Sequence, residues 1–443
     1  MLSQLLNFLD LVDDFFWDYM GVPVVLGLGL YLSIKSQWFQ VRAFPRIVGT
    51  FIFYIKKIDK GLGERGIAPV YAFFASIGGC IGVGNIVGVA TAVQIGGPGA
   101  IFWMWVTGLI GMIIKYAEIY LGVKFRVKNS NGSYDGGPMI FLQQLFKTKW
   151  VPRIVALLLC VYGVEIYMFR IVTHSVSSIW SINRNIIIAL LLLSILIVAK
   201  GGINIVGKIS TAIMPAFLTA FCGMSLFVII ANISILPRIF FIIIKSAFTG
   251  HAAIGAFAGS SILLTMSQGV RRACYTGDLG VGYASIIHSE TKEPNPERQA
   301  ALGVLGIFLD TFVVCSLSVL VILITGVWKG GFHEDVVVAS ALSTYFKHVD
   351  IIWPFFVFLL GYSSLIAFFS AGRKAAIFLS PKYGSKLFYV YAVLAFLSFS
   401  FIGEERHSLM IMSIAGALLA IINLYGMVRL RDKITFKMAD GKK

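Results

Sequence analysis

Charged residues are scarce in this sequence, and long apolar runs replace them. Asp, Glu, Lys and Arg make up 13% of the 443 residues, apolar residues make up 58%, and the mean hydropathy is +0.86. Soluble domains carry about twice as much charge. Residues 1–21 contain acids but no Lys or Arg, so the basic start of a cleavable signal peptide is missing. The composition predicts a polytopic membrane protein that retains its first helix.

Cysteine is rare, and catalytic motifs are missing. The five cysteines (Cys80, Cys160, Cys222, Cys274 and Cys315) lie in or beside apolar segments without paired spacing, which predicts neither disulfides nor a metal site. No HExxH motif, nucleophile elbow or phosphate loop occurs. GVGNIVG at 82–88 resembles a dinucleotide fingerprint, but it lies inside a membrane-length segment and follows no strand. We expect a protein that is not an enzyme and has no cofactor.

Eleven apolar stretches are long enough to cross about 30 Å of hydrocarbon. They lie near residues 20–40, 68–96, 99–123, 153–180, 185–200, 204–232, 251–272, 300–328, 351–379, 387–402 and 408–428. The stretch 234–248 is too short and too basic for a twelfth span, and we expect an external interfacial helix there. The predicted fold class is an all-α integral membrane protein with about 11 transmembrane helices.

The net charge of +16 is concentrated in alternate loops. Six segments that fall on one side of the membrane hold 29 of the 37 Lys and Arg residues: 35–65, 124–153, 200–208, 271–298, 373–386 and 429–443. Basic loops stay in the cytoplasm. This predicts a multi-pass protein of the cytoplasmic (inner) membrane, with its N-terminus outside and its C-terminus inside. The same distribution indicates that the basic residues orient the protein in the lipid bilayer and do not bind nucleic acid.

Glycine interrupts one of the predicted spans. Gly78, Gly79, Gly82, Gly84 and Gly88 fall within eleven positions, and each costs a helix about 1 kcal/mol relative to Ala. Irregular backbone at membrane depth is tolerated where it lines a cavity or packs against protein. Secondary transporters build binding sites from such breaks, whereas close packing through small residues is the alternative.

The layout divides into one extra helix and two groups of five. The second group opens at 251–272, with an interruption expected from Gly255 to Ser261, and under the charge pattern the two openers run in opposite directions. Interrupted helices at corresponding positions of inverted halves point to a transporter site. The expected parts are an N-terminal helix and linker (1–65), a first repeat (66–232), the interfacial helix (233–250), a second repeat (251–428) and a basic tail (429–443).

Two long stretches carry a resemblance to a known family. GVGNIVGVATAVQIGGPGAIFWMWVTGLIGMIIKYAEIYLGVKFR (82–126) and YDGGPMIFLQ (134–143) are similar to the alanine/glycine:cation symporter family. Members of that family resemble the bacterial leucine transporter, with a 5+5 inverted-repeat core and two broken helices. The resemblance therefore implies a secondary active transporter that couples sodium to the symport of alanine or glycine.

The resemblance also implies where ligands bind. The first break would bind the substrate carboxylate through Gly82 and Gly84, with Asn85 beside them. The second break would close over the substrate with Phe257, Gly259 and Ser260, for which a small-residue packing face is the alternative. Sodium would be held by carbonyl or hydroxyl oxygens of Gly78, Ile81, Leu360, Ser363 and Ser364. Without the resemblance, the two serines read as hydroxyls bonded to carbonyls of their own helix.

Glu165 and Arg170 are unusual charges within a span. Ionisable groups at membrane depth are costly and are usually paired or line a water-filled path. Arg170 can snorkel or face another helix, and one interpretation is a structural ion pair with Glu118, Lys115 or Asp310. The other is that Glu165 faces the pocket and either titrates or binds an ammonium group. A proton-coupled or differently selective amino-acid transporter therefore stays open, with a channel or a membrane enzyme as more distant alternatives.

Overall fold

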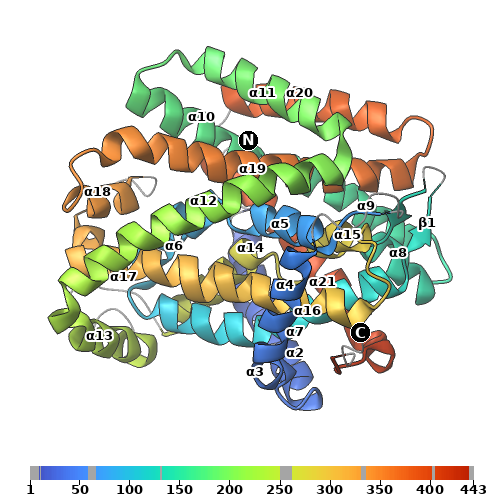
Figure 1. The fold of residues 1–443 in the computed structure, drawn as a ribbon, viewed down its shortest axis with the longest axis horizontal. Helices are drawn as coiled ribbons and strands as arrows, with labels where there is room; N and C mark the ends of the chain where they lie inside the picture. Colours follow the sequence, from blue (N-terminus) through green and yellow to red (C-terminus); the bar gives the residue numbers. More distant parts are fainter. Residues whose placement is uncertain are drawn as a thin grey trace.

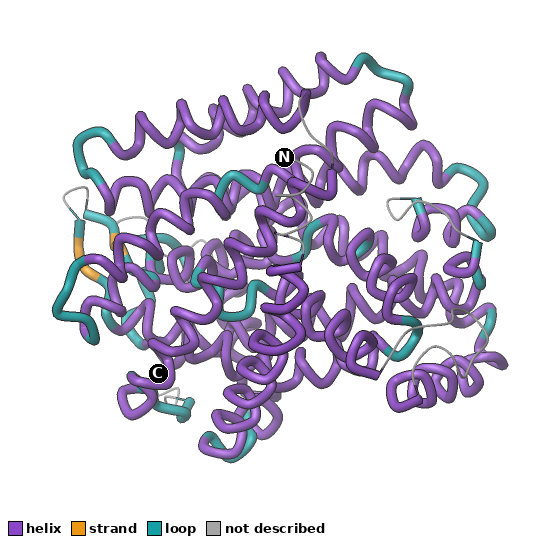
Figure 2. The backbone as a smooth tube through the Cα atoms, turned by 180° about the vertical axis from the view of Figure 1, so that it is seen from behind, coloured by secondary structure: helices purple, strands orange, loops and turns teal. Residues whose placement is uncertain are grey.

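The computed structural model describes residues 9, 11–57, 66–129, 132–249, 262–330, 336–401 and 405–438. Helices account for nearly all of this chain, as Figure 2 shows from behind. The two short strands, β1 (Val127–Lys128) and β2 (Tyr134–Asp135), pair antiparallel in one hairpin. The predicted all-α class is confirmed.

The helices follow one another with short connections. The first half contains η1 (Trp17–Gly21), α2 (Val22–Lys35), α3 (Phe39–Arg42), α4 (Phe44–Lys56), α5 (Pro69–Cys80), η2 (Val83–Asn85), α6 (Val87–Gly96), α7 (Ala100–Lys124), α8 (Pro138–Phe141), η3 (Leu142–Gln144), α9 (Trp150–Tyr162), α10 (Ile166–Trp180), α11 (Arg184–Lys200) and α12 (Gly202–Ala231). The second half contains η4 (Ile233–Ile235), α13 (Leu236–Thr249), α14 (Ile262–Gly277), α15 (Tyr283–Ser289), α16 (Pro296–Ile307), η6 (Phe308–Cys315), α17 (Ser316–Thr325), η7 (Val327–Lys329), α18 (Val337–Ser343), α19 (Val349–Leu379), α20 (Gly384–Phe401), α21 (Glu405–Arg429) and η8 (Arg431–Lys433).

Eight helical stretches within the described residues are long and apolar enough to cross a membrane, or nine if the bent pair α5 and α6 counts as one span. The predicted number of eleven is therefore not confirmed. One predicted span, 153–180, contains an unexpected interruption between α9 and α10, although together they reach across Trp150–Trp180. α13 occupies the stretch where an interfacial helix is expected.

Broken helices lie at the centre of the fold, enclosed by long continuous ones. Figure 1 shows α5, α14 and α15 in the middle, with α12 and α19 crossing on one side and α16 and α7 on the other. α12 packs along α5, α19 packs against α9 and α10, and α7 packs against α14, α15 and α16. Every described residue of α6 from Val87 to Val93 is buried. The Gly-rich segment therefore meets protein on all sides.

The first helix is tied to α14 by charge. Arg271 forms ion pairs with Asp13 (3.3 Å) and Asp14 (3.0 Å), and the Ser267 hydroxyl donates to Asp18. The predicted cytoplasmic loop starts at 271, whereas α14 continues to Gly277, so that Arg271 and Arg272 lie within the helix. The charge of Arg271 is balanced by acids of the first helix, a tertiary contact that the sequence pattern does not reveal.

Candidate functional site

The first break lies between α5 and η2, as the glycine cluster predicts. The two halves of this span are bent by 57°. The Gly82 N–H donates to the side-chain oxygen of Asn85 (3.0 Å) and to the Cys80 carbonyl (3.0 Å). Among the described residues, no backbone acceptor receives the N–H groups of Val83 and Gly84. The break thus offers free donors at Gly84, whereas the N–H of Gly82 is already engaged.

Asn85 joins this break to η6. Its amide nitrogen donates to Asp310 (2.5 Å), whose other oxygen accepts from Thr276 (3.1 Å) and Thr311 (3.0 Å). Asn85 and Asp310 are fully buried, and η6 is a π-helical segment, a distortion often found at functional sites. From the sequence, Asp310 was predicted only as a possible ion-pair partner. In the structure it holds the first break against η6.

Three of the five predicted sodium ligands lie together. The Ser364 hydroxyl donates to the carbonyls of Gly78 (3.0 Å) and Gly79 (3.1 Å). Ser363 lies 3.0 Å from the Ser210 hydroxyl, and a Cβ placed on Gly78 would lie 2.2 Å from the Ser363 Oγ. These contacts are made between helices rather than within α19, so the local interpretation of both serines does not hold.

The remaining predicted ligands are also buried near this point. Ile81 is the residue directly after α5, and Leu360 lies on α19 one turn before Ser364. Ser210 of α12 was missed, because it is one of several polar residues of this helix and nothing in the sequence distinguishes it from Thr211, Thr219 or Ser225. Carbonyl and hydroxyl oxygens are the ligands that hard cations prefer. The residues present therefore fit a sodium ion chemically.

The second break is found after α14. The chain leaves the helix at Gly277 and enters α15 at Tyr283, with positive φ at Asp278 (47°), Gly280 (78°) and Gly282 (97°). The expected interruption at 255–261, with Phe257, Gly259 and Ser260, lies outside the described residues. Three glycines within six positions (277, 280 and 282) mark the observed break, which was not predicted from the sequence.

Lys115 and Glu118 of α7 contact the backbone of the second break. The Lys115 ammonium donates to the Asp278 carbonyl (2.8 Å), and Glu118, one turn later, accepts from the N–H of Ser285 (3.3 Å). The Asp278 carboxylate accepts from the Tyr162 hydroxyl (3.0 Å) and the Cys80 thiol (3.4 Å). A carboxylate at a helix N-terminus is stabilised by the helix dipole. Lys115 and Glu118 therefore fix where α15 begins.

Glu165 occupies a third break, between α9 and α10. Its φ is 50°, a left-handed conformation that is uncommon for a residue other than Gly. The side chain is 2% exposed, and Oε2 has no hydrogen-bond partner. Arg170 donates instead to the Phe399 carbonyl of α20. In the part of the chain that the structure describes, the expected ion pair between Glu165 and Lys115 is therefore not formed.

A cavity of about 590 Å³ is lined by Leu279 and Val281 of the second break. Thr91 of α6 and Tyr275 of α14 also line it, as do Tyr162 and Tyr167 of α9 and α10, which together form the third core helix. Acids of the first helix form part of its wall, with Arg271. The size suits a small organic solute.

The chain is similar to known membrane transporters. The profile of the sodium:alanine symporter family matches residues 2–442. An uncharacterized transporter of Haemophilus influenzae is 31% identical over 98% of this chain and 95% of its own length. The sodium/alanine symporter AgcS of Methanococcus maripaludis is 30% identical over 95% of this chain and 93% of its own. The crystal structure of MhsT in complex with L-phenylalanine matches with a TM-score of 0.55 and 16% identity, over 81% of this chain and 88% of that one.

The structural match shows the fold, which is that of the leucine transporters, and the sequence matches show the class. The protein is a multi-pass secondary amino-acid transporter rather than an enzyme, as the sequence predicts. The chain belongs to the sodium:alanine symporter family.

Proposed function

We propose that this protein couples the sodium gradient to the uptake of a small neutral amino acid, alanine or glycine, across the cytoplasmic membrane. The observation that carries the proposal is the contact of Ser364 with the carbonyls of Gly78 and Gly79. It brings hydroxyls of α19 to the end of α5, where a sodium ion would bind oxygens of Gly78, Ile81, Leu360, Ser363 and Ser364. The name of the relative AgcS supports the same coupling.

The substrate carboxylate would bind at the first break, through the N–H of Gly84. Since the Gly82 N–H is engaged by Asn85, Gly82 contributes close approach of the backbone rather than a donor. Phe257, Gly259 and Ser260 stay predictions for the other wall. A small site discriminates against longer side chains, because each added methylene changes binding by about 1–3 kcal/mol.

A screen of amino acids tests this proposal directly. The purified protein is heated with each amino acid, with and without sodium, and the midpoint of unfolding is recorded. We expect alanine, glycine or serine to raise the midpoint only when sodium is present, since a ligand stabilises the state that binds it. Stabilisation by none of the amino acids would reject the proposal, and stabilisation by cationic ones alone would reject the neutral substrate.

Ser364→Ala is expected to raise the sodium concentration needed for half-maximal uptake while leaving membrane insertion intact. The variant removes the hydroxyl that contacts the Gly78 carbonyl, and loss of one such ligand costs about 1–2 kcal/mol, or about tenfold. Ser370→Ala is the matched control, because its hydroxyl bonds only to the Ile366 carbonyl of its own helix. An equal effect of both variants would contradict a role specific to Ser364.

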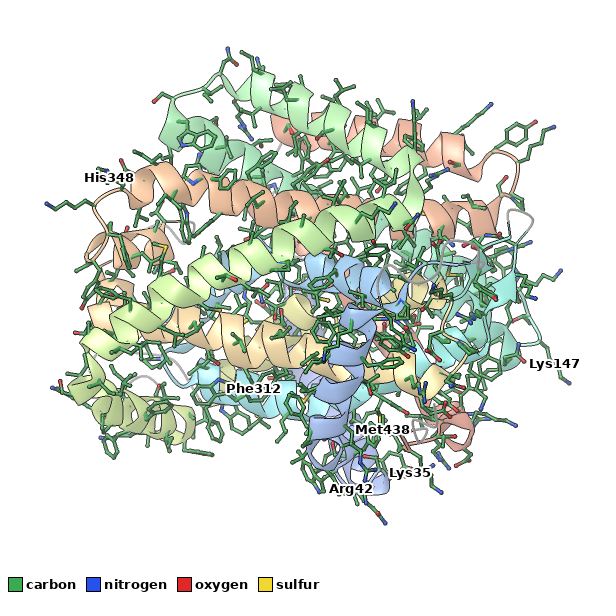
Figure 3. The ribbon with its side chains drawn as sticks, viewed as in Figure 1. Lys35, Arg42, Lys147, Phe312, His348 and Met438 are labelled. Atoms are coloured by element: carbon green, nitrogen blue, oxygen red, sulfur yellow. The ribbon has the colours of Figure 1, made fainter. Side chains whose placement is uncertain are left out.

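We further propose that the N-terminus lies outside and the C-terminus inside. In Figure 3, Lys147 of a predicted cytoplasmic loop and His348 of a predicted external loop lie at opposite ends of the long axis. In cysteine-accessibility mapping, single cysteines in 284–298 and in the C-terminal tail should be labelled from the same face. Labelling from opposite faces would overturn the topology.

Proton coupling is the second candidate, favoured by the unpartnered carboxyl group of Glu165. One relative, YrbD of Bacillus subtilis, is named a putative sodium/proton-dependent alanine carrier. Uptake that follows a proton gradient without sodium, and that Glu165→Gln abolishes, would support this candidate over sodium coupling.

A further inference from the structure

Two buried acids stand at two of the helix breaks in strained backbone conformations. Glu165 (φ 50°) separates α9 from α10, and Asp278 (φ 47°) separates α14 from α15. Each is at most 2% exposed, and the two side chains interact electrostatically. Left-handed conformations outside Gly cost energy and concentrate at functional sites. The fold thus holds two carboxyl groups in place at its centre.

These two acids differ in how their oxygens are satisfied. Both oxygens of Asp278 have donors, from Tyr162 and Cys80, whereas Glu165 Oε2 has none. Lys115, the nearby ammonium, bonds to the backbone carbonyl of Asp278 and not to either carboxyl group. Among the described residues, no Lys or Arg forms a salt bridge with Glu165. A buried charge without a partner is costly, so a positively charged ligand would stabilise the Glu165 carboxylate.

Glu165 does not itself line the cavity, but tyrosines next to it do. Tyr162, Tyr275 and Glu165 interact electrostatically, and both tyrosines line the cavity. The ring of Tyr275 packs against the first break, since a Cβ on Gly84 would lie 3.1 Å from it. Its hydroxyl has no partner in the described structure. Tyrosine rings favour cations over their faces.

We propose that the Glu165 carboxylate binds the α-ammonium group of the transported amino acid. The substrate carboxylate then lies at the Gly84 N–H, the ammonium points to the third core helix, and Asp278 adds negative potential behind it. This rests on the proposed transport of an amino acid. The substrate must then carry a free α-amino group, which the Glu165 carboxylate binds in addition to the backbone carbonyls of the break.

The test compares alanine with lactate and N-acetylalanine, which keep the carboxylate but lack the ammonium. Binding is measured on the full-length protein in lipid nanodiscs, by competition with radiolabelled alanine in sodium. We expect the wild type to bind alanine and to reject both analogues. Glu165→Gln should weaken alanine binding about 10- to 100-fold, as for loss of a charged hydrogen bond, and bring alanine and lactate closer in affinity. Glu165→Asp should fall between the two proteins.

Two controls separate binding from folding. Glu297→Gln, on the first turn of α16, removes a carboxylate that does not line the cavity, and it should bind alanine as the wild type does. The stabilisation of Glu165→Gln by sodium alone should be unchanged if the variant is folded and its sodium site is intact. Loss of that stabilisation would assign Glu165 to sodium or to folding and overturn the inference.

Other outcomes also decide the question. Equal alanine affinity of Glu165→Gln and the wild type overturns the inference, as does a variant whose only change is a lost dependence of uptake on pH, which marks a proton carrier. Tighter binding of lysine than alanine, lost in Glu165→Gln, assigns the carboxylate to a side-chain ammonium instead and overturns it as well. If no amino acid binds the wild type, the proposed function itself fails, so the two failures are distinguishable.

Discussion

Gly78→Ala is expected to raise the sodium concentration required for uptake by at least about tenfold, or about 1.4 kcal/mol. A Cβ at this position would lie 2.2 Å from the Ser363 Oγ and 2.7 Å from the Ser210 Oγ. Serine hydroxyls can turn away to relieve such a contact, but the turn removes Ser363 from its place at the proposed sodium site. Sodium-dependent uptake in proteoliposomes measures the effect.

Gly223→Ala is the matched control for this substitution. Gly223 lies in α12, and nothing lies within 4 Å of the position of its new Cβ, so we expect normal uptake. The double variant Gly78→Ala with Ser363→Gly removes the nearest clash without restoring the hydroxyl. It should not recover sodium affinity, because the Ser363 hydroxyl is missing. A Gly78→Ala protein with wild-type sodium dependence would falsify the assignment of this contact to the sodium site.

Lys115→Met is expected to cost about 3–5 kcal/mol of stability, as for removal of one partner from a buried charge pair. Lys115 is 2% exposed, donates to the Asp278 carbonyl and interacts electrostatically with Glu118 and Asp310. Removal of Lys115 leaves the carboxylates of Glu118 and Asp310 without this cation. It also removes the hydrogen bond to the Asp278 carbonyl at the second break. A large fall in the midpoint of thermal unfolding, read by size-exclusion chromatography, is the expected result.

A second substitution tests whether the uncompensated acids cause the loss of stability in Lys115→Met. Adding Glu118→Gln to Lys115→Met removes one of the uncompensated acids and should recover part of the stability, with a coupling of about 0.5–3 kcal/mol. Lys128→Met, at an exposed position of β1, should change stability by no more than about 0.5 kcal/mol. If Lys115→Met is as stable as Lys128→Met, the buried cluster does not depend on this lysine.

The membrane class, the all-α fold and the first break could all be predicted from the amino-acid sequence. These depend on local properties: apolar run length, and the preference of Gly78 to Gly88 for irregular backbone at membrane depth. The family followed from a colinear stretch of residues at 82–126. The predicted ligands Gly78, Ser363 and Ser364 are found in contact because that stretch and α19 keep the arrangement of the family's fold.

The pairing of charges, in contrast, follows from how the helices pack in three dimensions. Arg271 meets acids some 250 residues earlier in the chain, and Asn85 meets Asp310 across 225 positions. No local pattern encodes such contacts, since they depend on how broken helices pack together. For the same reason the break at 277–282 was not predicted, whereas the predicted interruption at 255–261 lies outside the described residues. Gly277, Gly280 and Gly282 interrupt α14 where Lys115 and Glu118 of α7 receive the exposed backbone, and that support comes from a helix more than 150 residues away.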